Sequence, residues 1–274
     1  MTTAVSPERQ QVARKKLSPR KRAQYTRIAQ YLVLALLAIG AVVSIDGGAL
    51  QRSFFRPDLI ASTLTYEILY AFGNTLAYTV GAFIIGLLIG TLLALMKLSQ
   101  VAPYRWIATI YTEFFRGVPA LIVIMVFSNI SIVFPGFKIP WDPYLTVWLA
   151  LGMVSSAYMS ETIRAGVQAV PKGQVEAARA LGMPAGMASH RIVLPQAFRI
   201  VIPPLTNELI LLTKDSSLVY IMGLTGLAFE LTKYGRFWSD QNANMTPLMI
   251  AALCYLIITV PLSILVRRME AKAD

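Results

Sequence analysis

The chain has 274 residues, of which 56% are hydrophobic and only 14% are charged. A soluble domain carries about a quarter charged residues, because its surface must face water. The composition therefore excludes an ordinary soluble protein and indicates an integral membrane protein. The formal net charge of +11 would also suit a nucleic-acid-binding protein, but the placement of the basic residues between apolar stretches argues against nucleic acid as a partner.

Six apolar stretches are long enough, or nearly so, to cross a lipid bilayer as helices, which takes about 20 residues each. No ten-residue alternation indicates a membrane β-barrel. The predicted fold class is therefore all-α, a polytopic membrane protein with about six transmembrane helices. The predicted spans are residues 28–45, 72–96, 118–134, 145–160, 205–227 and 247–266.

The lysine and arginine residues predict the orientation of these spans. With the N-terminus inside, the inner segments hold 18 of the 25 basic residues, the outer segments hold five, and two lie near or within spans. Cytoplasmic loops of membrane proteins carry such an excess. Both termini are therefore expected to be cytoplasmic.

The N-terminal part of the chain divides into three predicted segments. Residues 1–27 are polar and basic and are expected to form a cytoplasmic tail that contacts anionic lipid. Residues 28–45 have a long basic leader and no clear cleavage site, so we interpret them as a retained N-terminal transmembrane helix rather than a signal peptide. Residues 46–71 are expected outside, either as an amphipathic helix along the interface or as a simple linker.

The membrane core is expected over residues 72–266 and is followed by a short cytoplasmic tail, residues 267–274. Gly86 and Gly90 in the second span form a small-xxx-small face that allows close approach of another helix. Cys254 is the only cysteine, so it forms no internal disulfide, and we interpret it as an inert buried thiol.

The longest inner segment, residues 164–202, is too polar for lipid and too regular for a loose loop. It predicts a short helix over residues 174–181, in which Glu176 and Arg179 are spaced to pair. Gly182 stands where a left-handed helix cap belongs, and Pro184 prevents the helix from continuing. A short rigid helix on the cytoplasmic side indicates a docking element for a partner protein.

Two sets of motifs in this chain resemble a known family. EAA at positions 176–178, Gly182 after three intervening residues, and IVLP at 192–195 after nine more residues match the EAA signature of bacterial ABC importer permeases. Five further runs are similar to the polar amino acid permeases within that family. They are YTEFFRGVP at 111–119, AYMSETIRAG at 157–166, VPKGQ at 170–174, LPQA at 194–197 and KDSSL at 214–218.

The resemblance implies a permease subunit with the five-helix type I importer core over residues 72–266, here with an added N-terminal helix. It implies import of a polar amino acid across the bacterial inner membrane, with glutamate or glutamine as the first expected substrate and basic amino acids as the second. The implied partners are two ATP-binding cassette subunits, a second permease that is the same or homologous, and an extracellular amino-acid-binding protein.

The resemblance also implies that the cytoplasmic helix is a coupling helix that sits in a groove of the ATPase subunit. Small alanines would let the partner approach the helix backbone closely, and charged residues would provide contacts at its edge. A capped surface helix without a partner is the structural alternative. The expected ATPase-coupling residues are Glu176, Ala177, Ala178, Arg179, Ala180 and Gly182.

The chain is not expected to be an enzyme. It contains no G-x-x-x-x-G-K-[ST] phosphate-binding loop, so ATP and Mg²⁺ are expected on the partner subunit and no cofactor is expected in this chain. His190 is the only histidine, which argues against a metal centre or a nucleophilic triad. An ion-coupled secondary transporter is the main alternative, although the lack of internal repeats opposes it; a membrane-embedded enzyme is a second alternative.

Four polar residues in the fifth span are candidates for the substrate pathway: Asn207, Lys214, Asp215 and Ser216. Polar groups at this depth are costly unless they pair or face a wet cavity, and a zwitterionic amino acid needs an acceptor for its ammonium and donors for its carboxylate. Packing or gating is the alternative role for these residues. Two i,i+3 pairs, Glu113 with Arg116 and Glu161 with Arg164, are expected to be structural pairs near the cytoplasmic face.

Overall fold

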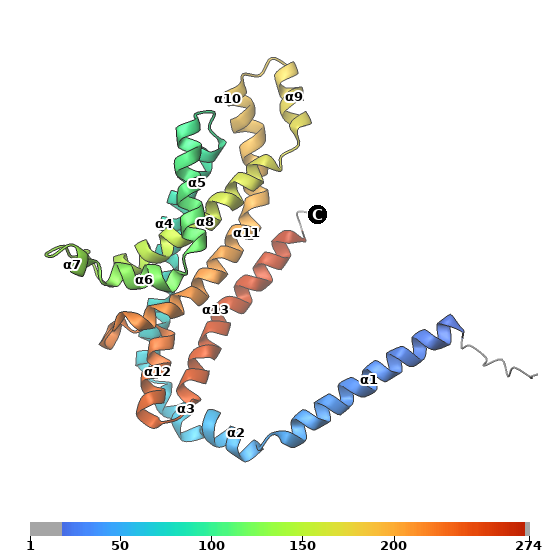
Figure 1. Ribbon diagram of the computed structural model, residues 1–274, viewed down its shortest axis with the longest axis vertical. Coiled ribbons are helices and arrows are strands. Elements are labelled where there is room, and N and C mark those ends of the chain that lie inside the picture. Colours follow the sequence, from blue (N-terminus) through green and yellow to red (C-terminus); the bar gives the residue numbers. More distant parts are fainter. Residues whose placement is uncertain (1–17, 272–274) are drawn as a thin grey trace, which may run out of the picture. The chain divides into compact units, whose positions relative to one another are not determined.

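The computed structural model describes residues 18–271, and these residues form helices, turns and loops with no strand (Figure 1). The predicted all-α class is thus confirmed. The chain divides into two compact units, one ending at Arg52 and the other beginning at Ser53.

The N-terminal unit is built on one long helix, α1 (Pro19–Ser44). The helix begins inside the predicted tail, so residues 19–27 are helical, while the cytoplasmic location of this segment stays a prediction. The physical reason is a helix start at Ser18 and Pro19: the Lys21 N–H donates to Ser18 Oγ (3.4 Å), and proline is well suited to the first helical position. Residues 1–17 of the predicted tail, and residues 272–274 at the other terminus, lie outside the described residues.

Residues 46–71, the predicted outer segment, are helical but do not form a single amphipathic helix. The segment contains α2 (Gly47–Phe54) and α3 (Pro57–Thr63), and α4 (Tyr66–Leu98) begins within it. The first break lies just before Pro57, because the residue that precedes a proline is disfavoured in helical conformation.

The rest of the second unit consists of helices joined mostly by short connections. Three short segments of other helix types lie between them. These are the π-helical segment η1 (Ser189–Val193) and the 3₁₀-helical segments η2 (Ser216–Met222) and η3 (Gly226–Ala228). The helices are α5 (Ala102–Gly117), α6 (Ala120–Ser128), α7 (Ile130–Val133), α8 (Tyr144–Gln168), α9 (Lys172–Ala180), α10 (Ala185–Ala188), α11 (Leu194–Asp215), α12 (Leu231–Asn242) and α13 (Thr246–Glu270).

The six predicted spans fall mostly on these helices, but α8 and α11 are not among the helices that are long and apolar enough to be candidate spans. Among the described residues, α1, α4 and α13 are long and apolar enough to cross a membrane, and the pair α5 and α6, bent by 98°, is a fourth candidate. The predicted third span, residues 118–134, is not one helix, because α6 ends at Ser128 and α7 begins at Ile130. The predicted fifth span, residues 205–227, starts too late, since α11 already begins at Leu194.

Helices α4 and α8 pack along a seam of small residues. A Cβ atom at Gly86 would lie 2.3 Å from Ser155 Oγ, and one at Gly90 would lie 3.0 Å from the Ser156 carbonyl oxygen. On the facing helix, a Cβ at Gly152 would lie 3.1 Å from the Ala82 carbonyl oxygen. The predicted close approach at Gly86 and Gly90 is confirmed, and glycine is required on both helices.

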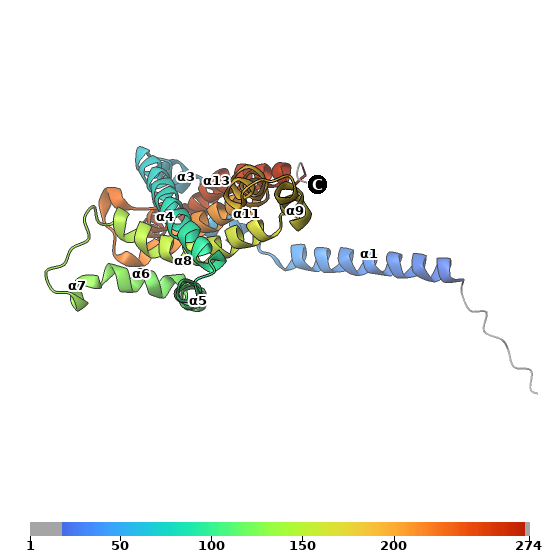
Figure 2. The same ribbon diagram turned by 90° about the horizontal axis from the view of Figure 1, so that it is seen from above.

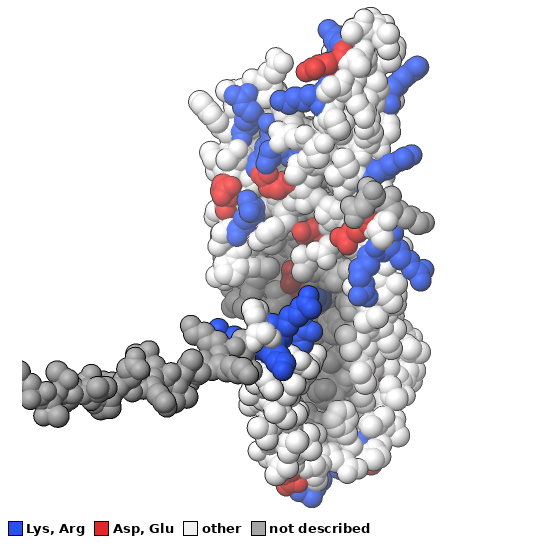
Figure 3. Space-filling view, turned by 90° about the vertical axis from the view of Figure 1, so that its right-hand side faces the viewer, with Lys and Arg blue, Asp and Glu red and all other residues white. Residues whose placement is uncertain are grey.

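The second unit has two distinct ends. Helices α9 and α10 and the turn between α4 and α5 lie at one end, and α12 with the start of α13 lies at the other (Figure 1). We call the first the α9 end. Seen from above, α6 runs beside α8 (Figure 2). Lysine, arginine, aspartate and glutamate side chains are scattered over the α9 end, at the top of Figure 3.

Helix α12 was not among the predicted elements. Its start is capped by Glu230, whose carboxylate accepts from the Thr232 and Lys233 backbone N–H groups (2.5 and 2.6 Å). The Tyr255 hydroxyl of α13 donates to the same carboxylate (2.9 Å), and Glu230 is fully buried. This network ties α12 to α13, because a buried carboxylate is tolerated only with its hydrogen bonds satisfied.

Candidate functional site

The predicted docking helix is α9, which is short, exposed and firmly capped. Gly182 has a φ of +82°, and its N–H donates to the Arg179 carbonyl (3.0 Å), while the Met183 N–H donates to the Ala178 carbonyl (3.1 Å). This pair of bonds is a Schellman motif, which fixes where a helix ends. The predicted left-handed cap at Gly182 is thus confirmed.

One side of α9 faces the protein and the other faces outward. Ala178 is buried, whereas Glu176, Ala177, Arg179 and Ala180 are exposed. Leu181, which directly follows the helix, is 87% exposed. An exposed leucine beside exposed alanines is an apolar surface outside the spans, which is suited to contact with a partner.

The predicted pair between Glu176 and Arg179 is not formed. The Arg179 guanidinium donates instead to the Met183 carbonyl (3.2 Å), because carbonyl groups at a helix C-terminus attract cationic side chains. On the opposite side, the Gln196 side-chain amide donates to the Gln174 side-chain oxygen, which joins α9 to the start of α11.

A polar cluster holds α4, α5 and α8 together at the α9 end. The Lys97 ammonium, 8% exposed, donates to Thr112 Oγ1 (2.6 Å) and pairs with Glu161. Glu161 also accepts from Arg164 (2.9 Å), so the predicted Glu161–Arg164 pair is present. The other partner of Glu161, Lys97, lies on α4, and no pattern in the sequence predicts that it pairs with a residue of α8. The predicted Glu113–Arg116 pair is also present, exposed and longer, at 3.8 Å.

The four predicted pathway residues do not form one site. Asn207 and Lys214 are exposed, and Ser216 is buried with its hydroxyl donating to the Thr213 carbonyl (2.7 Å). Only Asp215 lines a cavity, which we call the α11 cavity.

The α11 cavity has a volume of about 470 Å³ and lies between the bend that joins α5 to α6, helix α8, and helix α11. Leu151, Val154, Leu211 and Leu212 supply much of its apolar wall. The charged and hydrogen-bonding side chains in its lining are Arg116, Ser155, Tyr158, Glu208 and Asp215.

Two walls of the α11 cavity carry opposite charges. Arg116 stands at the bend, with its guanidinium 5.9 Å from the ring centre of Tyr158. Glu208 and Asp215 stand on α11, seven residues apart, so they lie on the same side of that helix two turns apart. Arg116 and Glu208 were not predicted to belong with Asp215. The i,i+7 spacing could have indicated Glu208, but nothing in the local sequence places Arg116 beside α11.

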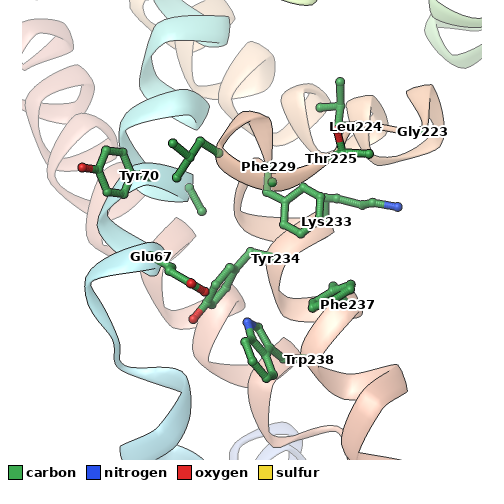
Figure 4. Close-up of a pocket in the computed structure, with 13 residues that line it drawn as sticks. Glu67, Tyr70, Gly223, Leu224, Thr225, Phe229, Lys233, Tyr234, Phe237 and Trp238 are labelled. Atoms are coloured by element: carbon green, nitrogen blue, oxygen red, sulfur yellow. The ribbon is translucent and has the colours of Figure 1, made fainter.

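A second cavity lies near the end opposite α9, between the start of α4, the loop from Gly223 to Leu227, and α12 (Figure 4). Its volume is about 590 Å³ and its lining is largely aromatic. Lys233 lies 5.8 Å from the ring centre of Phe229. The only charged residues in the lining are Glu67 and Lys233, so this cavity offers less to a polar ligand than the α11 cavity. The aromatic side chains are Tyr70, Phe229, Tyr234, Phe237 and Trp238.

No group of histidine, cysteine, aspartate and glutamate residues suited to a metal ion occurs within residues 18–271. The charged groups of the α11 cavity are carboxylate acceptors on one wall and a guanidinium on the other.

The chain is similar to known transport proteins. The chain is 38% identical over 205 residues to the arginine transport system permease protein ArtQ of Bacillus subtilis, covering 75% of this chain and 91% of that protein. It is 39% identical over 199 residues to the putative glutamine transport system permease protein GlnP of Rickettsia bellii, covering 72% and 88%. A solved amino acid ABC transporter chain, from a crystal structure described as having histidines, superposes with a TM-score of 0.69 at 34% identity, covering 78% of this chain and 97% of that chain.

Residues 82–274 match the family described as the binding-protein-dependent transport system inner membrane component. This match covers more than half of the chain and includes the bend at Pro119, helix α9 and the α11 cavity. The chain therefore belongs to the family of inner-membrane components of binding-protein-dependent transport systems.

Proposed function

We propose that this chain is the membrane-spanning subunit of an importer of polar amino acids that is driven by ATP hydrolysis on a separate subunit. The observation that carries the proposal is α9, an exposed small-residue helix with the family's spacing from Glu176 to Gly182 and a fixed cap. The relatives named for arginine and glutamine transport support an amino acid as cargo.

Helix α9 is proposed to dock into the ATPase subunit through its exposed residues Glu176, Ala177, Arg179, Ala180 and Gly182, while the buried Ala178 packs the helix against its own chain. The small alanine side chains allow a partner to approach the helix backbone closely, and the exposed Leu181 next to them offers an apolar contact. Two ATPase subunits, a second permease subunit and an extracellular binding protein complete the proposed assembly, and ATP with Mg²⁺ would be bound by the ATPase subunits.

The α11 cavity is proposed to form this subunit's part of the substrate pathway. It is large enough for an amino acid, since ligand cavities usually measure about 300–1,000 Å³. The cavity is lined by residues of the bend at Pro119 and by residues of α8. Helix α8 runs on to the short connection that leads into α9. Movement of α9 could therefore reach the cavity through one continuous helix, as in rigid-body rocking of packed helices.

The proposed function is tested by transport in proteoliposomes that contain the chain with its candidate ATPase and binding protein. Uptake of an amino acid is expected to require ATP inside and to continue when ionophores remove the ion gradients. Uptake without ATP, abolished by ionophores, would instead identify an ion-coupled secondary transporter.

The orientation is a separate prediction. With α9 in the cytoplasm, Gly173→Cys in a Cys254→Ser background should resist an impermeant maleimide in right-side-out vesicles. Asp240→Cys, on α12 at the other end, should react. Both positions are exposed, so solvent access is matched. Labelling of Gly173→Cys but not Asp240→Cys would reverse the proposed orientation, in which both termini are cytoplasmic.

A further inference from the structure

The two carboxylates of the α11 cavity are unpaired. Glu208 and Asp215 are half-buried, and neither makes a hydrogen bond or ion pair with any residue from 18 to 271. The neighbouring Lys214 is exposed and does not line the cavity. Buried charged groups are costly unless they are paired or hydrogen-bonded, so both carboxylates are placed to meet a cation that enters the cavity.

The spacing of the carboxylates bears on the shape of that cation. Seven residues of α-helix correspond to about 10 Å along the axis. A single ammonium group hydrogen-bonded to one carboxylate is therefore poorly placed to bind the other as well. A ligand with a positive group at each end can reach both.

The facing wall is suited to a negative group. Arg116 lines it, and so does Ala120, the first residue of the nine-residue helix α6. The first N–H groups of a helix have no partner within the helix, and together with the helix dipole they favour an anion. Interrupted membrane helices present such ends to the carboxylates of their substrates.

We propose that the α11 cavity takes a basic amino acid, with arginine or lysine as the chemical class, an assignment that rests on the proposed import function. Two carboxylates and one guanidinium match the α-ammonium, the cationic side chain and the α-carboxylate of such a substrate. A neutral amino acid would leave one cavity carboxylate without a counter-charge, and glutamate would add a further negative charge. The cavity thus favours the second of the two substrate classes expected from the sequence.

The test uses the permease–ATPase complex in lipid nanodiscs without its binding protein, because the binding protein would impose its own selectivity. Equilibrium binding and stimulated ATP hydrolysis are measured with arginine, with its neutral urea analogue citrulline, and with glutamate. Arginine is expected to bind about tenfold or more tightly than citrulline or glutamate, since hydrogen bonds to charged groups are the stronger ones.

Variants then assign the effect to the cavity. Glu208→Gln and Asp215→Asn are each expected to weaken arginine binding by about tenfold, and at least one of them should narrow the preference for arginine over citrulline. Asp240→Asn removes an exposed carboxylate on α12 and should change neither quantity.

Two results would overturn the assignment. Equal or tighter binding of citrulline or glutamate by the unmodified complex would reject a basic substrate while leaving amino acid import standing, because an amino acid would still stimulate the ATPase. A complex that binds arginine selectively with Glu208 and Asp215 both replaced would show that the cavity does not select. If no amino acid binds the complex, the assignment of the cavity fails, whereas the proposed function is judged separately by uptake in the proteoliposomes that contain the binding protein.

Discussion

Ala177→Trp should abolish transport and substrate-stimulated ATP hydrolysis while the complex still reaches the membrane. Ala177 is exposed on α9, so a large side chain would meet no neighbour within the chain. It would instead stand between α9 and the groove of the partner and hold the two surfaces apart. Loss of transport to background is expected, because a docking interface tolerates little separation at its centre.

Ala61→Trp is the matched control for this prediction. Ala61 is also an exposed helical alanine, but it lies on α3, away from the α9 end. Normal transport is expected for this variant. If Ala177→Trp keeps stimulated hydrolysis at the unmodified level, α9 is not the docking element.

Gly182→Val tests the contribution of the α9 cap independently of the exposed side chains of the helix. With φ at +82°, a β-branched residue would be strained by about 1–2 kcal/mol. The helix end should therefore shift while every exposed side chain of α9 remains. Partial loss of coupling, smaller than for Ala177→Trp, is expected in the same hydrolysis assay.

Glu161→Gln is expected to produce the largest loss of stability among the ion-pair variants of this chain. It leaves the Lys97 ammonium, 8% exposed, with only the Thr112 hydroxyl as partner. Removing one member of a buried pair costs about 3–5 kcal/mol, because the remaining charge is uncompensated. Since the Glu161 side chain is 27% exposed, we expect about 3 kcal/mol, at the lower end of that range.

Thermal unfolding in detergent provides the measurement. Arg164→Gln should cost less, because Glu161 would keep Lys97 and the Arg164 side chain is 34% exposed. Glu113→Gln is the control: its pair with Arg116 is exposed and 3.8 Å long, so at most about 1 kcal/mol is expected. Equal destabilisation by all three variants would contradict a specific role for the buried cluster.

Local features of the sequence were sufficient for several parts of this structure. Long apolar runs predicted α4 and α13, and the glycine at 182 predicted the end of α9, because a left-handed cap depends on one residue and its neighbours. The helix start at Ser18 is equally local. Hydropathy does not detect it, because the first turns of α1 are polar and basic.

Other parts depended on contacts between distant segments. Lys97 and Glu161 are 64 residues apart, and no pattern within either helix pairs them. Arg116 and Glu208 line the same cavity only because α5 bends away from α6 next to α11. Pro119 marked a break, but a bend of 98° is set by packing around it. The candidate site was therefore predicted only at Asp215.

The glycine seam between α4 and α8 restricts how this subunit can move. Where Gly86, Gly90 and Gly152 bring the two backbones into contact, sliding one helix along the other would drive side chains into main-chain atoms, and a close-packed interior resists such strain. We therefore expect α4 and α8 to move as one rigid body during the transport cycle. The α11 cavity would then open and close by tilting of α11 and α6 relative to this helix pair, with η2 and the bend at Pro119 as the hinges.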